Sequence, residues 1–247
     1  KRRFGITVDP SGEIQSTIGG KEALVHIVWA YIDPSDVVLV PDPAYSVYKV
    51  QTSWCGGAAF PMPLRAENGF LPDFDAIPEA VRKQAKMLFL NYPNNPTGAV
   101  APLEFFEEAV AFARKYEMVI VQDAAYAEVY YDAADRPHSI LEVEGAKDVA
   151  IEVHSLSKTF NMTGWRVGWA WGGGEHIEAL SRAKSNVDSG TFMAIQRAAA
   201  VGLESYDAFA PQIQQVRPHP GQARSAERLR ALLADSEIRD SHRENDP

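Results

Sequence analysis

One lysine and one arginine stand in a segment that otherwise has the composition of a protein interior. From Ser155 to Ala170 the sequence reads SLSKTFNMTGWRVGWA, with Lys158 among small hydroxylated residues and Arg166 eight positions later. Charged side chains are rarely fully buried unless they are paired or used. A lysine that forms a Schiff base must lose its proton, and desolvation and nearby cations favour that loss. We therefore expect Lys158 to be a desolvated nucleophile.

A second group of candidate residues lies upstream, around the apolar run MVIVQDAAY. Asp123 ends that run, and an ion pair with a protonated pyridine nitrogen would stabilise its charge and make the ring a better electron sink. A turn or helix-capping aspartate is the simpler alternative. Tyr126 can reach the same ligand with its hydroxyl. Asn95 in NNPTG offers an amide donor on a proline-fixed loop, although turn chemistry alone also explains it.

A candidate anion site combines a glycine pair at the start of a helix with hydroxyl donors and an arginine. Glycine lets the backbone approach a ligand, and the first amides of a helix point outward toward it. An arginine adds a charge-assisted, forked contact. A Gly-Gly pair before a helix is weak evidence by itself. The residues concerned are Gly20 and Lys21 at the helix start, together with Ser155, Ser157 and Arg166.

The elements that must position these residues alternate between buried strands and amphipathic helices. Strands without polar alternation, separated by amphipathic helices, predict a mostly parallel sheet covered on both faces, a three-layer α/β/α architecture. The expected strands are DVVLVPDPAY, KMLFLN, MVIVQD, VAIEVHSLSK and RVGWAWGG; the expected helices begin at Gly19 (stopped by Pro34), at PLEFFEEAVAFARKYE, and at about Glu175 and Thr191.

The carboxyl ends of the predicted strands bring the candidates together. Ligands of open α/β sheets collect at this edge. Four candidate side chains lie at or just past a strand end: Tyr45, Asn95, Asp123 and Lys158. Tyr45 follows a proline and can present its aromatic face to a flat ligand.

Composition excludes several other classes of function. The chain has 247 residues and a net charge of −9, which disfavours a nucleic-acid or anionic-membrane partner. A single cysteine, Cys55, fits a reducing compartment and has no basic neighbour that would activate it. No run is long and apolar enough for a membrane span, the start is not a signal peptide, and no metal-ligand spacing occurs. We expect a cytoplasmic protein without a metal site.

The ordered motifs resemble the large domain of the fold-type I pyridoxal-phosphate enzymes, specifically the class I and II aminotransferases. SLSKTFNMTGWRVGW resembles their Schiff-base lysine motif, NYPNNPTG their cofactor loop, and DAAY their aspartate–tyrosine pair. GGKEAL and VPDPAYSVY are most similar to the LL-diaminopimelate aminotransferase group. The likeness covers roughly Gly5 to Val216.

The resemblance implies a role for each candidate. Lys158 would hold pyridoxal 5'-phosphate through a Schiff base, and Asp123 would pair with the ring nitrogen. Asn95 and Tyr126 would bond the phenolic oxygen, and Tyr45 would stack on the ring. The phosphate would be held by Gly20, Lys21, Ser155, Ser157 and Arg166.

The implied reaction is transamination between an amino acid and a 2-oxo acid, in a homodimer. The freed amine of Lys158 would act as general base and then as general acid. Two alternatives stay open: a carbon–sulfur β-lyase, which uses the same lysine and aspartate, and a cofactor-binding remnant without turnover. A regulator of related fold would carry a basic helix-turn-helix arm, and none is seen.

The domain organisation departs from the resemblance at both ends. We expect residues 1–216 to form the cofactor-binding large domain and residues 217–247 to form an atypical polar tail. The family's small domain, with the arginine that binds the substrate carboxylate, is not recognisable there. The sequence also starts only about twenty residues before GGKEAL, so we expect an incompletely covered apolar surface that favours association.

Overall fold

A computed structural model of the chain describes residues 3–130 and 136–214. The predicted polar tail, residues 217–247, lies outside the described residues, as does the predicted end of the large domain. Within the described part, no helix has the length and apolar character needed to cross a membrane.

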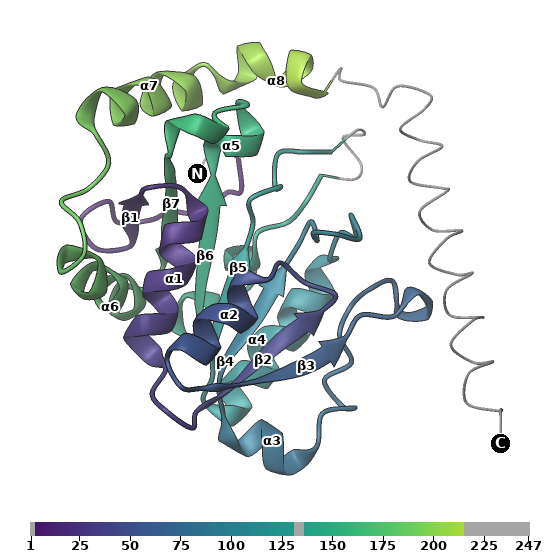
Figure 1. Cartoon of the computed structure of the whole chain (residues 1–247). Coiled ribbons are helices and arrows are strands. Elements are labelled where there is room, and N and C mark those ends of the chain that lie inside the picture. Colours follow the sequence, from purple (N-terminus) through teal and green to yellow (C-terminus); the bar gives the residue numbers. More distant parts are fainter. Residues whose placement is uncertain (1–2, 131–135, 215–247) are drawn as a thin grey trace, which may run out of the picture.

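A seven-stranded sheet forms the centre of the molecule, in the order β1-β7-β6-β5-β4-β2-β3 (Figure 1). Five neighbouring strands, from β6 to β3, run parallel. Strand β7 is antiparallel to both of its neighbours. The strands are β1 Ile14–Thr17, β2 Val37–Asp42, β3 Ala58–Pro63, β4 Ala85–Asn91, β5 Val119–Asp123, β6 Ala150–Ser155 and β7 Gly168–Gly172.

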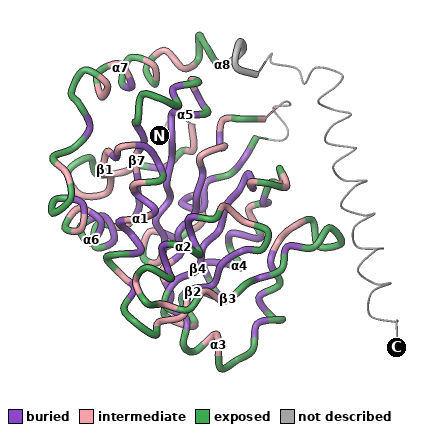
Figure 2. Tube along the Cα trace, viewed as in Figure 1, coloured by how far each residue is buried: buried purple, intermediate pink, exposed green. Residues whose placement is uncertain are grey.

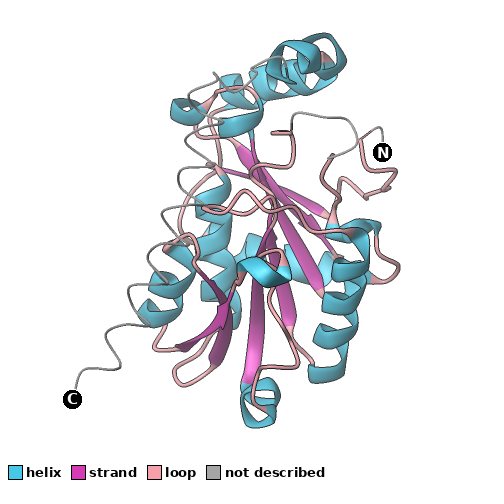
Figure 3. Cartoon of the chain, turned by 90° about the vertical axis from the view of Figure 1, so that its right-hand side faces the viewer, coloured by secondary structure: helices cyan, strands magenta, loops and turns pink. Residues whose placement is uncertain are grey.

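Helices cover both faces of this sheet, so the molecule has three layers (Figure 3). The helices are α1 Gly20–Tyr31, α2 Val47–Trp54, α3 Glu79–Gln84, α4 Leu103–Tyr116, α5 Leu156–Thr159, α6 Gly174–Ser185, α7 Met193–Glu204 and α8 Tyr206–Gln214. Short 3-10 turns also occur, including Ile140–Glu142 and Thr163–Trp165.

Each sheet face has its own apolar core because successive strand residues point to opposite faces. In β2, Val38 and Val40 belong to the core shared with α1, α2 and α6. Their neighbour Leu39 belongs to the core shared with α4. Strand β4 repeats the alternation, with Met87 facing the first core and Leu88 the second. The central strands are therefore buried on both sides (Figure 2).

A third, smaller apolar cluster joins α5 to α7 at one end of the molecule (Figure 1). Leu156 of α5 and Ala199 of α7 are buried in it. Helix α7 has Ala199 as its buried residue, and it leaves large apolar side chains in solvent. These include Met193 and Val201, together with Phe192 just before the helix, which is 73% exposed.

The structure confirms the predicted three-layer, mostly parallel fold and the strands and helices expected in it, with one correction. The run VAIEVHSLSK is not strand throughout, because β6 ends at Ser155 and Leu156–Thr159 is the helical turn α5. The Ser155 hydroxyl accepts a hydrogen bond from the Ser157 amide at 3.2 Å, which caps this turn. The sheet-edge strands β1 and β3 and the helices α2 and α3 were not predicted.

The approach of α1 to the sheet gives a prediction about Gly168. A Cβ at this position would lie 2.5 Å from the carbonyl oxygen of His154 and 3.0 Å from the amide nitrogen of Gly20. Both atoms are backbone, so relief requires displacement of the chain. Gly168→Ala should lower the free energy of unfolding by about 1–3 kcal/mol or more, measured by denaturant titration.

Gly164→Ala is the matched control, because a Cβ there would have no neighbour within 4 Å. It should change stability by about 0.5 kcal/mol or less. An equal loss in the two variants would contradict the close-approach argument.

Candidate active site

A cavity of about 590 Å³ opens at the carboxyl ends of the central strands, and all ten predicted site residues line it. Four further residues complete its wall, and the sequence reasoning assigned none of them. The predicted lining residues are Gly20, Lys21, Tyr45, Asn95, Asp123, Tyr126, Ser155, Ser157, Lys158 and Arg166; the additional ones are Leu24, Asn91, Ala125 and Thr163.

Asp123, the last residue of β5, is a nearly buried acid with 6% of its surface exposed. Its Oδ2 accepts a hydrogen bond from the Tyr48 hydroxyl at 2.8 Å, and its Oδ1 accepts one from the Ala125 amide at 3.2 Å. Burial raises the pKa of Asp123, and these hydrogen bonds offset only part of that effect. Within residues 3–130 and 136–214, no cationic side chain forms an ion pair with it. The carboxyl is thus an acceptor that a cationic ligand would stabilise.

Lys158 lies on α5, three residues beyond the end of β6, and its side chain is exposed. Its ammonium is 5.5 Å from the centroid of the Tyr126 ring, within range of a cation–π contact. The expectation that Lys158 is desolvated is therefore wrong. The helical turn capped by Ser155 lifts Lys158 out of the sheet and places it on the wall of an open cavity.

The candidate anion site forms where α1 begins. Gly19 has a positive φ of 81°, and a Cβ there would lie 2.3 Å from Nη2 of Arg166, so this guanidinium packs directly against the glycine. Arg166 donates to the carbonyl oxygens of Thr163 and Ile18 at 2.9 and 3.3 Å. The first amides of a helix and an arginine are the two donors that an anion such as phosphate prefers.

Two buried serines contribute to the same wall. Ser155 and Ser157 are 7% and 9% exposed, and both line the cavity with Gly20. A Cβ on Gly20 would lie 3.5 Å from the Cβ of Ser155, so the end of β6 is in contact with the start of α1. The hydroxyl groups, the helix start and Arg166 therefore meet in one part of the cavity.

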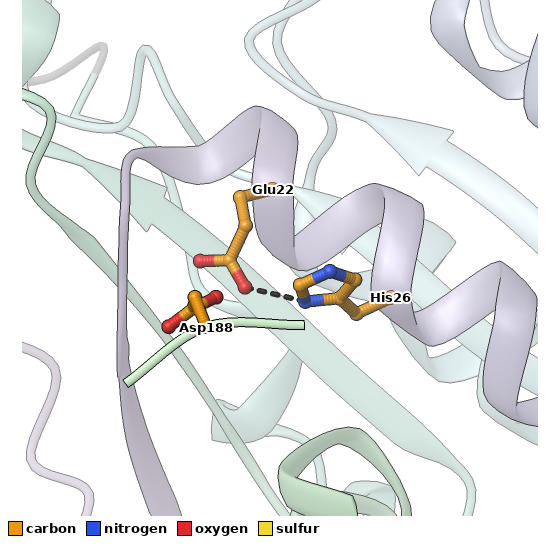
Figure 4. A group of neighbouring side chains, drawn as sticks. All are labelled: Glu22, His26 and Asp188. Carbon is orange, nitrogen blue, oxygen red and sulfur yellow. Dashed lines mark ion pairs between the residues drawn. The ribbon is translucent and has the colours of Figure 1, made fainter. Parts of the chain in front are cut away.

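An ion-pair cluster fixes the chain just before that helix start. Glu22 Oε2 accepts a hydrogen bond from the amide of Ile18 at 2.6 Å. The same carboxylate pairs with Nδ1 of His26 at 2.5 Å, and Asp188 lies beside the two (Figure 4). By residue type the three could bind a metal ion. However, the ammonium of Lys184 lies 2.6 Å from Asp188 Oδ1 and 3.3 Å from both Glu22 oxygens, so it supplies the positive charge itself.

The remaining predicted residues lie on loops after β2 and β4 and at the start of α1. Tyr45 is half-buried, and the ammonium of Lys21 lies 5.4 Å from the centroid of its ring. Lys21 is exposed. The amide of Asn95 donates to Asn91 Oδ1 at 2.8 Å, which ties the Asn95 loop to the end of β4.

Two residues that hold the site were missed by the sequence reasoning. Tyr48 is fully buried and bonds Asp123, while Asn91 Nδ2 donates to the carbonyl oxygen of Asp123 at 2.8 Å. A signal was present for both. Tyr48 follows Tyr45 by three positions in VPDPAYSVY, and Asn91 is the polar end of the strand KMLFLN.

The donor set fits pyridoxal 5'-phosphate. The cavity offers a buried carboxyl for a protonated ring nitrogen, a primary amine for an aldehyde and an anion site for a phosphate. Two tyrosines, Tyr45 and Tyr126, also line the wall. A flat, charged heterocycle with these three groups needs this combination of partners.

Comparison with known proteins gives a consistent result. The profile of the family described as "Aminotransferase class I and II" matches residues 1–239. The LL-diaminopimelate aminotransferase of Desulforudis audaxviator is 55% identical over 202 residues, which are 82% of this chain and 51% of that protein. The chain thus spans about half the length of the curated relatives it matches.

Two solved structures show the same fold at moderate identity. An aminotransferase from Staphylococcus aureus has a TM-score of 0.84 at 37% identity, covering 96% of this chain and 61% of that one. A probable N-succinyldiaminopimelate aminotransferase from Thermus thermophilus has a TM-score of 0.80 at 36% identity, covering 87% and 56%.

The burial of Asp123 gives a prediction about the cofactor-free protein. Because its pKa is raised above the ordinary 3.8, the folded state resists ionisation of this carboxyl. This lowers the free energy of unfolding once the pH exceeds 3.8, where Asp123 ionises in the unfolded chain. The loss of stability is complete once the pH is above the pKa of Asp123 in the folded state. Asp123→Asn should therefore be more stable than the parent at neutral pH, with the difference vanishing below pH 3.8.

Denaturant unfolding over a pH series measures this difference. Glu67→Gln removes a carboxyl whose side chain is 73% exposed, and it should alter stability little at any pH. A loss of stability at neutral pH in Asp123→Asn would contradict the assignment of an unpaired buried carboxylate.

Proposed function

The chain belongs to the class I and II aminotransferase family, whose members use pyridoxal 5'-phosphate, and on that premise we propose that it transfers an amino group from an amino acid to a 2-oxo acid. One observation carries the proposal: a lysine amine, a buried carboxyl and an anion site share a single cavity. The curated relatives, of which the chain spans about half the length, are aminotransferases by name. Their names support an aminotransferase activity.

We assign the two ends of the cofactor ring to Asp123 and Lys158. Asp123 would accept a hydrogen bond from the protonated ring nitrogen, which supplies the positive charge that the buried carboxyl lacks. Lys158, the exposed residue of the turn α5, would attach the cofactor through Nζ. Asn95 and Tyr126 would bond the phenolic oxygen, and Tyr45 would cover one face of the ring.

We assign the phosphate to the start of α1 and the end of β6. The backbone at Gly20 and Lys21 and the hydroxyls of Ser155 and Ser157 would donate to it. Arg166 would add the balancing charge from its place against Gly19.

Proton transfer in this scheme falls to Lys158. The bound cofactor supplies an electron sink for the charge left when a proton leaves the substrate α-carbon. The Lys158 amine would take that proton as general base and would later return a proton as general acid. Its exposure on a short turn suits a side chain that must change partners. LL-Diaminopimelate, the substrate in the name of the curated relatives, is the first donor to test.

We further propose a cytoplasmic homodimer. The single cysteine fits a reducing compartment. Exposed apolar residues on and just before α7 and on α8 offer a surface that association would cover: Phe192, Met193, Val201 and Phe209.

The visible absorption spectrum of the purified chain with pyridoxal 5'-phosphate tests the function directly. The parent should give a protein-bound chromophore that borohydride fixes to the chain, and LL-diaminopimelate with 2-oxoglutarate should change the spectrum and form glutamate. Release of pyruvate and ammonia from a sulfur-containing amino acid would instead indicate a β-lyase. A bound chromophore without either turnover would indicate a cofactor-binding remnant.

Lys158→Ala should abolish the borohydride-fixed adduct, because it removes the amine that forms the covalent bond. Lys21→Ala is the matched control, since Lys21 also lines the cavity and its loss should weaken binding but leave the adduct on the chain. Mass spectrometry of the fixed protein locates the modified residue. An adduct that persists in Lys158→Ala would overturn the assignment.

Sedimentation of the full chain tests the association. A dimer or larger species is expected, because the apolar side chains around α7 are otherwise in water. Val201→Asp, on the 62% exposed Val201, should shift the population toward monomer. A monodisperse monomer of the parent chain would contradict the proposal.

A further inference from the structure

We propose that Tyr48 is a positioning residue that fixes the orientation and the charge of Asp123 toward the cofactor ring. The inference rests on the proposed function, because it concerns the carboxyl that we assign to the ring nitrogen. Tyr48 is fully buried and does not line the cavity, so it would act through Asp123 and not by touching the cofactor.

Packing holds the Tyr48 ring rigidly against the sheet. The ring stacks on Phe89 of β4, with centroids 4.5 Å apart and planes 18° from parallel. The Tyr45 ring packs against the Tyr48 ring at 5.8 Å, with the two planes at 89°. The Tyr48 carbonyl accepts a hydrogen bond from the Thr52 hydroxyl at 2.8 Å, one turn further along α2. The hydroxyl thus comes to Asp123 from a fixed direction.

The Asp123 carboxylate is restrained at each oxygen. Tyr48 donates to Oδ2 at 2.8 Å and the Ala125 amide donates to Oδ1 at 3.2 Å. Asn91 holds the backbone carbonyl of the same residue. One donor on each oxygen fixes the carboxyl plane and leaves further lone pairs for a ring N–H. The orientation of the acceptor is therefore set before any ligand arrives.

The charge of Asp123 also depends on this hydroxyl. Burial favours the neutral acid, and the hydrogen bond from Tyr48 lowers the pKa of Asp123 against that effect. Burial, and then the nearby Asp123 charge, raise the pKa of Tyr48 well above its ordinary value, so the phenol stays protonated and remains a donor. Without the hydroxyl, Oδ2 would be a buried acceptor with no hydrogen-bond partner among the residues that the structure describes, and the carboxylate would be disfavoured.

A purely structural tyrosine would behave differently from a positioning residue. If Tyr48 only packs, removal of its hydroxyl should have the same effect whatever the charge at position 123. The proposed role requires a carboxylate at that position. A double-mutant cycle with Tyr48→Phe and Asp123→Asn separates the two. Phenylalanine keeps the ring that stacks on Phe89 and removes only the hydroxyl.

The experiment measures the dissociation constant of pyridoxal 5'-phosphate by visible absorption in the full chain and its variants. Tyr48→Phe should weaken binding roughly 10- to 100-fold, the range for a hydrogen bond to a charged group. In the Asp123→Asn background the same change should have little effect. Tyr92→Phe is the matched control: Tyr92 is also buried, its hydroxyl bonds the carbonyl oxygen of Phe70, and its loss should leave the affinity unchanged.

A second measurement needs no cofactor. In denaturant unfolding, the stability lost in Tyr48→Phe should be larger at neutral pH than at a pH low enough to protonate Asp123. A loss that is independent of pH, together with equal affinity losses in both backgrounds, would reduce Tyr48 to a packing role and overturn the inference. So would unchanged affinity in Tyr48→Phe. If the parent chain binds no cofactor through Lys158, the proposed function itself fails, which is a distinct result.

Discussion

The structure of this site depends on one electrostatic constraint, a carboxyl held at the end of a buried strand with no ion-pair partner among residues 3–130 and 136–214. Asp123 is nearly buried at the end of β5, and the hydrogen bonds from Tyr48 and Ala125 do not cancel the cost of burying its charge. A protein tolerates such a group when a ligand completes it. The other residues of the cavity wall are suited to bind a ligand that has a positive ring and a negative end.

The wall of the cavity carries charges of both signs. The start of α1 and Arg166 offer positive potential, and Asp123 offers a negative acceptor. Glu22, which contacts His26 and Lys184, accepts a hydrogen bond from the Ile18 amide. Arg166 donates to the carbonyl oxygen of the same Ile18. The anion site is therefore shaped by contacts outside the cavity as well as by its lining.

The parallel sheet explains why residues so distant in sequence form one site. Strands β2, β4, β5 and β6 run parallel, so their carboxyl ends share one edge. Seven of the ten predicted residues lie at these ends or within four positions of them, as Asp123 and Asn95 show. Gly20 and Lys21 come from the start of α1, and Arg166 comes from the segment before β7. The fold thus brings the chemistry together through strand direction, and loop and turn geometry decides where each side chain finally lies.

The sequence by itself determined the layer architecture and ten of the residues that line the cavity. The apolar runs around Val121 and Val153 predict buried parallel strands, and their polar ends predict the candidates, because period and burial are local properties of the chain. Family resemblance supplied the roles of these candidates and the identity of the cofactor. Only the tertiary structure decided that Lys158 is exposed on a helical turn and that Tyr48 reaches Asp123 from α2. Exposure and long-range hydrogen bonds depend on how elements that are far apart in the sequence pack together, and no local sequence pattern encodes that packing.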